Sequence, residues 1–146
     1  MRSDEGDLHF ADVRTPSGLV IEFQHSHIGE DEVRAREQFY GDLVWVIDGT
    51  RLKRDRSSFF DGMDQNRGLG MNPEQYVFNG NGRQITRRWA VSEKLVYLDF
   101  GDTDLWCVSP YQSKWQFFAV RVTKTEFVAA CGTGRMAPAV GRLPNP

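Results

Sequence analysis

The chain has 146 residues, a formal net charge of −2 at pH 7 and 40% hydrophobic residues, including four Trp and ten Phe. This size and apolar content suit one domain with a packed core, and the small net charge argues against a generally basic nucleic-acid binder. The sequence contains no membrane-length apolar run, no signal-peptide core and no C-x-x-C motif, since Cys107 and Cys131 are far apart. We therefore expect a cytoplasmic protein with reduced thiols and no membrane partner.

Charge is unevenly distributed along the chain. Residues 1–50 hold four Lys or Arg against eleven Asp or Glu, whereas residues 51–90 hold eight against four. An acidic segment followed by a basic one is what a metal-dependent enzyme acting on a polyanion needs. The alternative is that this uneven distribution of charged residues arises by chance.

Residues 10–24 are predicted to form a β-hairpin around which the rest of the chain is organised. Pro16 fixes its φ at about −65°, which excludes a two-residue turn of type I′ or II′. A three-residue loop suits the sequence, with Gly18 in the left-handed conformation at its end. Thr15 then lies opposite Leu19.

This register brings two carboxylates together. Counting outward from the loop places Asp12 opposite Glu22, with Cβ atoms roughly 5 Å apart. Two like charges at that distance are destabilising unless a divalent cation binds them or one carboxyl has a raised pKa. The alternative is an exposed acidic pair with the register shifted by one residue, which puts the two carboxylates on opposite faces.

Side-chain alternation gives the hairpin one polar and one apolar face. The polar face carries Asp12, Glu22 and Gln24. The apolar face, which we expect to lie in the core, carries Ala11, Val13, Leu19, Ile21 and Phe23.

A βαβ unit is predicted to follow the hairpin. Residues 29–40 have the acidic first turn of a helix, and Gly41 is placed as its C-terminal stop. The apolar run 43–47 is typical of a strand buried on both faces, parallel to the second hairpin strand with a right-handed crossover. Asp48 and Gly49 end that strand, and ligand sites in such sheets lie near strand ends.

The rest of the chain is predicted to complete a single domain at residues 1–134, with the βαβ core at 8–60. The next elements are a basic helix at 50–60, a loop at 61–82 with a short strand at 76–78, and a helix at 84–92. An antiparallel meander with flanking helices fills residues 76–131, with strands at 95–100, 105–108 and 115–122. Thr123 and Glu126 form a capping-box signature for a short helix that ends near Ala130. Residues 135–146 are predicted to be a disordered tail.

The combined pattern resembles the nuclease domain of the competence protein CoiA-like family, a branch of the PD-(D/E)XK superfamily. The matching residues are His9-x-Ala-Asp12-Val13, Ile21-Glu22-Phe23-Gln24-x-Ser26-x-Ile28, Glu32 to Tyr40, and Val44-Trp45-Val46-Ile47. The resemblance covers roughly residues 9–50. It implies an α/β fold of restriction-endonuclease type and metal-dependent hydrolysis of phosphodiester bonds in DNA, during DNA uptake, recombination or defence.

The resemblance also implies site residues. Asp12 and Glu22 would bind Mg²⁺ or Mn²⁺, and the carbonyl of Phe23 would add a ligand. Gln24 stands where the superfamily most often has Lys. Because Gln brings no charge, it orients the attacking water or a phosphate oxygen by hydrogen bonds, and the mechanism depends on the metal.

A further group of side chains is expected to contact the nucleic acid. Its members are His9, Ser26, Arg51, Lys53, Arg54, Arg56, Arg87 and Arg88. Lys and Arg suit phosphate contacts, and for each of them a solvated helix face is the alternative. Ser26 also suits a cap of the following helix. Glu32 and Arg36 are spaced as a helical ion pair.

One departure from the superfamily pattern leaves a second function open. The superfamily core has a helix and a strand before the strand that carries the Asp, and the eleven residues before Asp12 cannot hold both. A homodimer or a partner protein would then complete the core. The alternative function is a catalytically incomplete protein of nuclease fold that acts as a nucleic-acid-binding or assembly module.

Overall fold

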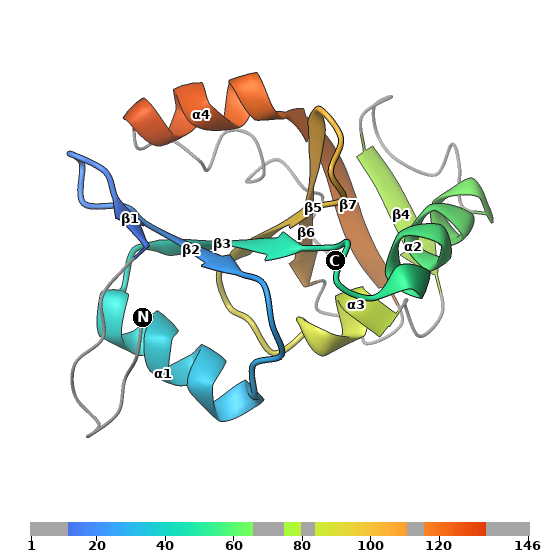
Figure 1. The fold of residues 1–146 in the computed structure, drawn as a ribbon, viewed down its shortest axis with the longest axis horizontal. Helices are drawn as coiled ribbons and strands as arrows, with labels where there is room; N and C mark the ends of the chain where they lie inside the picture. The colour runs from blue at the N-terminus through green and yellow to red at the C-terminus, as the bar shows by residue number, and fades with distance from the viewer. Residues whose placement is uncertain (1–11, 66–74, 80–83, 111–115, 134–146) are drawn as a thin grey trace.

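The computed structural model describes residues 12–65, 75–79, 84–110 and 116–133 (Figure 1). Its elements are β1 (Val13–Arg14), β2 (Val20–Gln24), α1 (Glu30–Tyr40), β3 (Leu43–Asp48), α2 (Lys53–Gln65), β4 (Gln75–Asn79), α3 (Gln84–Arg88), β5 (Leu95–Asp99), β6 (Asp104–Pro110), β7 (Gln116–Thr123) and α4 (Lys124–Thr133). Within these ranges, seven strands form one sheet in the order β1-β2-β3-β5-β6-β7-β4. The predicted α/β class with a mixed sheet is confirmed, and the predicted tail lies outside the described residues.

Two crossovers build the parallel part of the sheet. β2 and β3 are parallel and α1 connects them, as the βαβ pattern predicted. β5 then lies parallel to β3 on its other side, after a connection that contains α2, β4 and α3. The parallel pairing of β3 and β5 was not predicted. The residues between these strands form two helices and one strand, and their sequence does not indicate beside which strand the chain rejoins the sheet.

The antiparallel part of the sheet is the predicted meander. β5, β6 and β7 pair antiparallel in chain order, and β4 pairs with the outer edge of β7. The predicted capping box begins α4: the Thr123 N–H donates to Glu126 Oε1 at 2.9 Å, and the Glu126 N–H donates to Thr123 Oγ1 at 3.0 Å. The capping box of Thr123 and Glu126 therefore fixes where β7 ends and α4 begins.

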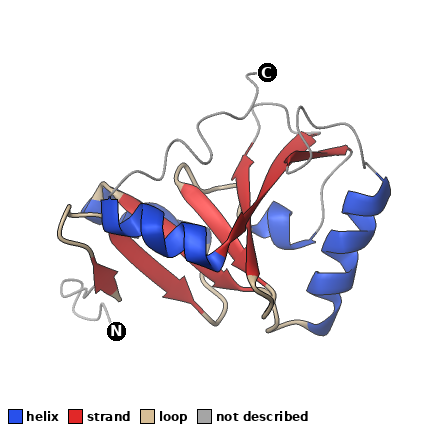
Figure 2. Cartoon of the chain, turned by 90° about the horizontal axis from the view of Figure 1, so that it is seen from above, coloured by secondary structure: helices blue, strands red, loops and turns tan. Residues whose placement is uncertain are grey.

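Helices cover both faces of the sheet (Figure 1 and Figure 2). Val33 of α1, Phe59 of α2 and Ile85 of α3 belong to one buried cluster. Phe127 and Cys131 of α4 belong to a second cluster on the opposite face. None of the helices in the described ranges is long and apolar enough to cross a membrane.

The central strand β3 is buried on both faces, as its apolar sequence predicted. Where β3 meets α1, one carboxylate accepts three hydrogen bonds. Glu37 is 7% exposed, and it accepts from Trp45 Nε1 (2.8 Å), Ser92 Oγ (2.6 Å) and the Glu93 N–H (3.1 Å). These bonds fasten α1 to the middle of the sheet and fix how the helix lies over it.

The helix ends agree with the glycine signals for α1 and less well elsewhere. Gly29 is the N-cap of α1, and Gly41 follows its end with a φ of 74°. α2 continues to Gln65, into the predicted loop, and α3 already ends at Arg88. The turn after α3 instead supplies the polar groups that bind the carboxylate of α1.

Candidate functional site

The hairpin has the turn and the register that its sequence predicts. Gly18 adopts a φ of 95°, and its N–H donates to the Thr15 carbonyl at 2.9 Å. The Thr15 N–H donates to the Leu19 carbonyl at 2.8 Å. Val13 lies opposite Ile21 in the antiparallel pair of β1 and β2. A register shifted by one residue is thereby excluded.

The two carboxylates of the hairpin meet across this pair of strands. The Asp12 N–H donates to Glu22 Oε2 at 3.2 Å, and the Phe23 N–H donates to Asp12 Oδ2 at 2.8 Å. Each carboxylate thus accepts a backbone N–H from the strand that carries the other one. The sequence correctly predicts that Asp12 and Glu22 lie together.

Glu22 is buried and paired with an arginine, and so it does not belong to an exposed acidic face. Its side chain is 0% exposed, because β2 lies under α1 at this point. Arg36 of α1 places Nη1 3.2 Å from Glu22 Oε1, and its Nε donates to Glu32 Oε2 at 2.7 Å. The predicted Glu32–Arg36 helix pair is therefore present. The contact from Arg36 to Glu22 was not predicted.

Burial raises the pKa of Glu22 above its ordinary value of 4.5. The Asp12 N–H and Arg36 act in the opposite direction, while the charge of Asp12 raises the pKa further. The repulsion that the sequence predicts is thus offset by a guanidinium and backbone N–H groups of the protein itself.

The apolar face of the hairpin is only partly in the core. Leu19 and Ile21 are buried in the cluster on the α4 side. Val13 and Phe23, also expected in the core, are 41% and 38% exposed. Both belong to the two strands at the β1 edge of the sheet, and neither packs in the buried cluster on the α4 side. Ala11 lies outside the described residues.

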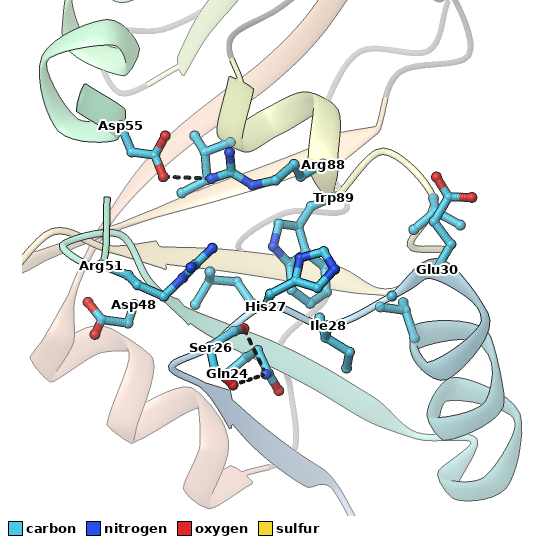
Figure 3. Close-up of a pocket in the computed structure, with 15 residues that line it drawn as sticks. Gln24, Ser26, His27, Ile28, Glu30, Asp48, Arg51, Asp55, Arg88 and Trp89 are labelled. Atoms are coloured by element: carbon cyan, nitrogen blue, oxygen red, sulfur yellow. Dashed lines mark hydrogen bonds and ion pairs between the residues drawn. The ribbon is translucent and has the colours of Figure 1, made fainter. Parts of the chain in front are cut away.

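A cleft of about 300 Å³ opens at the carboxyl ends of β2 and β3 (Figure 3), and neither Asp12 nor Glu22 is among the residues that line it. The first turn of α1 and the end of α3 form its other walls. Its polar and aromatic lining includes Gln24, Ser26, His27, Glu30, Asp48, Arg51, Asp55, Arg88 and Trp89. Acidic and basic groups are mixed, so the cleft is not a uniformly positive channel. Its place at the ends of parallel strands is where ligands usually bind in such sheets.

Gln24 connects the acidic pair to the cleft. It lies two positions after Glu22 on β2, so both side chains point to the α1 face of the sheet. Its Nε2 donates to the Ser26 carbonyl at 2.9 Å and to Ser26 Oγ at 3.3 Å (Figure 3). Ser26 therefore holds the Gln24 amide, and α1 has no side-chain cap at its N-terminus.

Two of the predicted basic residues reach the cleft. Arg51 extends into it from the loop after β3, whereas Arg88 turns to Asp55 and pairs with it at 2.6 Å (Figure 3). The remaining predicted contacts lie elsewhere. Lys53, Arg54 and Arg87 are exposed, Arg56 pairs with Asp102 at 3.1 Å, and His9 lies outside the described residues.

Asp48 is an acidic residue of the cleft, and from the sequence it was predicted only to end a strand. Besides the cleft, it lines a hollow of about 240 Å³ on the other face of the sheet. Its Oδ1 accepts the Thr50 N–H at 2.9 Å and the Thr50 hydroxyl at 2.5 Å, and its Oδ2 is 3.6 Å from His25 Nδ1. The Thr50 hydroxyl, more than the other contacts, lowers the pKa of Asp48. These bonds close the turn after β3.

Comparison of the chain with known protein families, curated proteins and solved structures found no match.

Proposed function

We propose that the protein is a metal-dependent nuclease that hydrolyses phosphodiester bonds in DNA. The observation that carries the proposal is the pair of hydrogen bonds that join Asp12 and Glu22 across the hairpin, two residues along β2 from Gln24, which lines the cleft. Together with the family resemblance of residues 9–50, these hydrogen bonds support the pair as the proposed metal-binding carboxylates.

The donor set suits a small divalent cation. Mg²⁺ is usually bound by one or two carboxylates together with substrate phosphates and water. Among the residues that the structure describes, no group of three or more His, Cys, Asp or Glu side chains suits a metal ion. In the proposed site, Asp12 and Glu22 would hold Mg²⁺ or Mn²⁺ with the Phe23 carbonyl, and the DNA phosphate and water would complete the ligands. Such an ion supplies a water of lowered pKa and neutralises charge on the phosphate.

The other residues of the site position the DNA. Gln24, whose amide is held by Ser26 in the cleft, orients the attacking water or a phosphate oxygen. Arg51 points into the cleft and contacts a neighbouring phosphate. Arg88 is fixed by Asp55, so it contributes little net charge and serves mainly to shape the cleft.

The test is cleavage of supercoiled plasmid and of single-stranded DNA in Mg²⁺, in Mn²⁺ and in EDTA. We expect cleavage that requires the metal and that falls by at least about 100-fold in Asp12→Asn, since the variant keeps its size but loses a ligand charge. Asp31→Asn is the matched control, because Asp31 is an exposed carboxylate of α1. Failure of the wild type to cut either DNA, or full activity in Asp12→Asn, would contradict the proposal.

The complete burial of Glu22 favours a second candidate function, in which the domain binds nucleic acid without cutting it. In that case a fluorescent oligonucleotide binds at low salt with no metal present. Arg51→Ala weakens that binding, and no DNA is cleaved under any metal condition.

A further inference from the structure

Glu22 forms an ion pair with a cationic side chain of the protein itself. Arg36 is 13% exposed, and its guanidinium bridges two carboxylates, Glu22 at 3.2 Å and Glu32 at 2.7 Å. The other oxygen of Glu22 accepts the Asp12 N–H. Both oxygens of the buried carboxylate therefore have partners within the protein.

We propose that Arg36 is a positioning residue that occupies the cation's place at Glu22, so that a divalent ion binds only when the guanidinium leaves Glu22 and stays on Glu32. The inference rests on the proposed function, because it takes the pair of Asp12 and Glu22 as the metal site.

The geometry makes the two cations competitors. The Arg36 Nη1 lies 3.2 Å from Oε1 of Glu22, so a metal ion held by Asp12 and Glu22 would bind the carboxylate that the guanidinium already contacts. A divalent ion bound at Glu22 and the guanidinium of Arg36 would also repel each other, and the repulsion would be strong because Glu22 is buried.

Glu32 gives the displaced guanidinium a second partner. Its carboxylate lies one helical turn before Arg36, is 37% exposed and accepts from Nε, not from the nitrogen that faces Glu22. Arg36 can therefore release Glu22 without becoming a buried, unpaired charge. Removing Glu32 takes away this second position and makes the release more costly.

The neighbouring residues of α1 provide matched controls. Arg34 carries the same charge as Arg36, but it pairs with Glu30 and Asp31 on the exposed side of the helix. Asp31 likewise matches the charge of Glu32, but it pairs with Arg34. A general effect of net charge would appear equally in these controls.

The experiment is a calorimetric titration of the full chain and four variants with Mn²⁺ at about pH 8, well above the ordinary pKa of a carboxyl group. We expect Arg36→Gln to bind Mn²⁺ at least about tenfold more tightly than the wild type, and Glu32→Gln to bind at least about threefold more weakly. Arg34→Gln and Asp31→Asn should stay within about twofold of the wild type. If Arg36→Gln folds only with Mn²⁺ present, that dependence itself supports the exchange of one cation for the other.

The outcomes separate this inference from the proposed function. Saturable binding that Arg36→Gln leaves unchanged or weakens overturns the role of Arg36 and leaves the metal site intact. If Arg36→Gln is unfolded with or without Mn²⁺, Glu32→Gln decides, and an affinity equal to that of the wild type overturns the inference. The absence of binding in every folded variant overturns the metal site and the proposed function together.

Discussion

Glu22→Gln is expected to abolish metal-dependent cleavage, by a factor of roughly 1,000 or more, while the protein stays folded. The amide keeps the size of the carboxyl and one acceptor oxygen for the Asp12 N–H or for Arg36, but it removes the charge that holds a cation. The measurement is the initial rate of plasmid nicking, with circular dichroism to confirm folding. Cleavage within about tenfold of the wild type would remove Glu22 from the site.

The same variant has a pH dependence with a definite sign. Because burial raises the pKa of Glu22 above 4.5, the folded protein binds this proton more tightly than the unfolded chain does. Its contribution to stability is therefore complete at low pH and is lost as pH rises through the folded value. Gln has no such loss. The free energy of unfolding of Glu22→Gln, relative to the wild type, should increase between about pH 4 and about pH 8. Cleavage by the wild type should rise over the same range, since a protonated Glu22 holds no cation.

Glu37→Ala is expected to lower the free energy of unfolding by about 3–5 kcal/mol, the largest stability effect that we predict. The substitution leaves Trp45 Nε1 and the Glu93 N–H without the acceptor they have in the native protein, whereas Ser92 Oγ loses one partner and keeps its bonds to the carbonyl and the N–H of Lys94. Each buried group left without a partner costs roughly 1–3 kcal/mol.

Urea denaturation at neutral pH measures this effect. Gln38→Ala is the control, because Gln38 is the next residue of α1 and is exposed, and it should change stability by less than about 0.5 kcal/mol. Glu37→Gln retains an acceptor oxygen and should lie between the two. A loss below about 1 kcal/mol in Glu37→Ala would show that these hydrogen bonds do not fasten α1 to the sheet.

Local chemistry accounts for the features of the fold that the sequence predicts correctly. The left-handed glycine at position 18 and the fixed φ of Pro16 select the hairpin loop, and the loop sets the register. The apolar run of β3 and the capping box of α4 need only neighbouring residues to be recognised. For the same reason, the contact between Asp12 and Glu22 was predictable.

The features that were not predicted depend on how separate elements pack. Glu22 and Arg36 are 14 positions apart, and they meet only because α1 lies over β2 at a particular angle. Glu37 and Ser92 are 55 positions apart, so nothing local indicates their hydrogen bond. The exposure of Phe23 has the same origin, since strand alternation shows that a face is apolar but not whether another element covers it.

The account depends on a cation bound between Asp12 and Glu22, and its position can be measured directly. Crystals of the protein grown or soaked with Mn²⁺ would give the ion's position from its anomalous scattering. We predict a peak in contact with both carboxylates, with Arg36 moved away from Glu22 and still paired with Glu32. Saturating Mn²⁺ with no peak between the two carboxylates, and with Arg36 still bound to Glu22, would contradict the account.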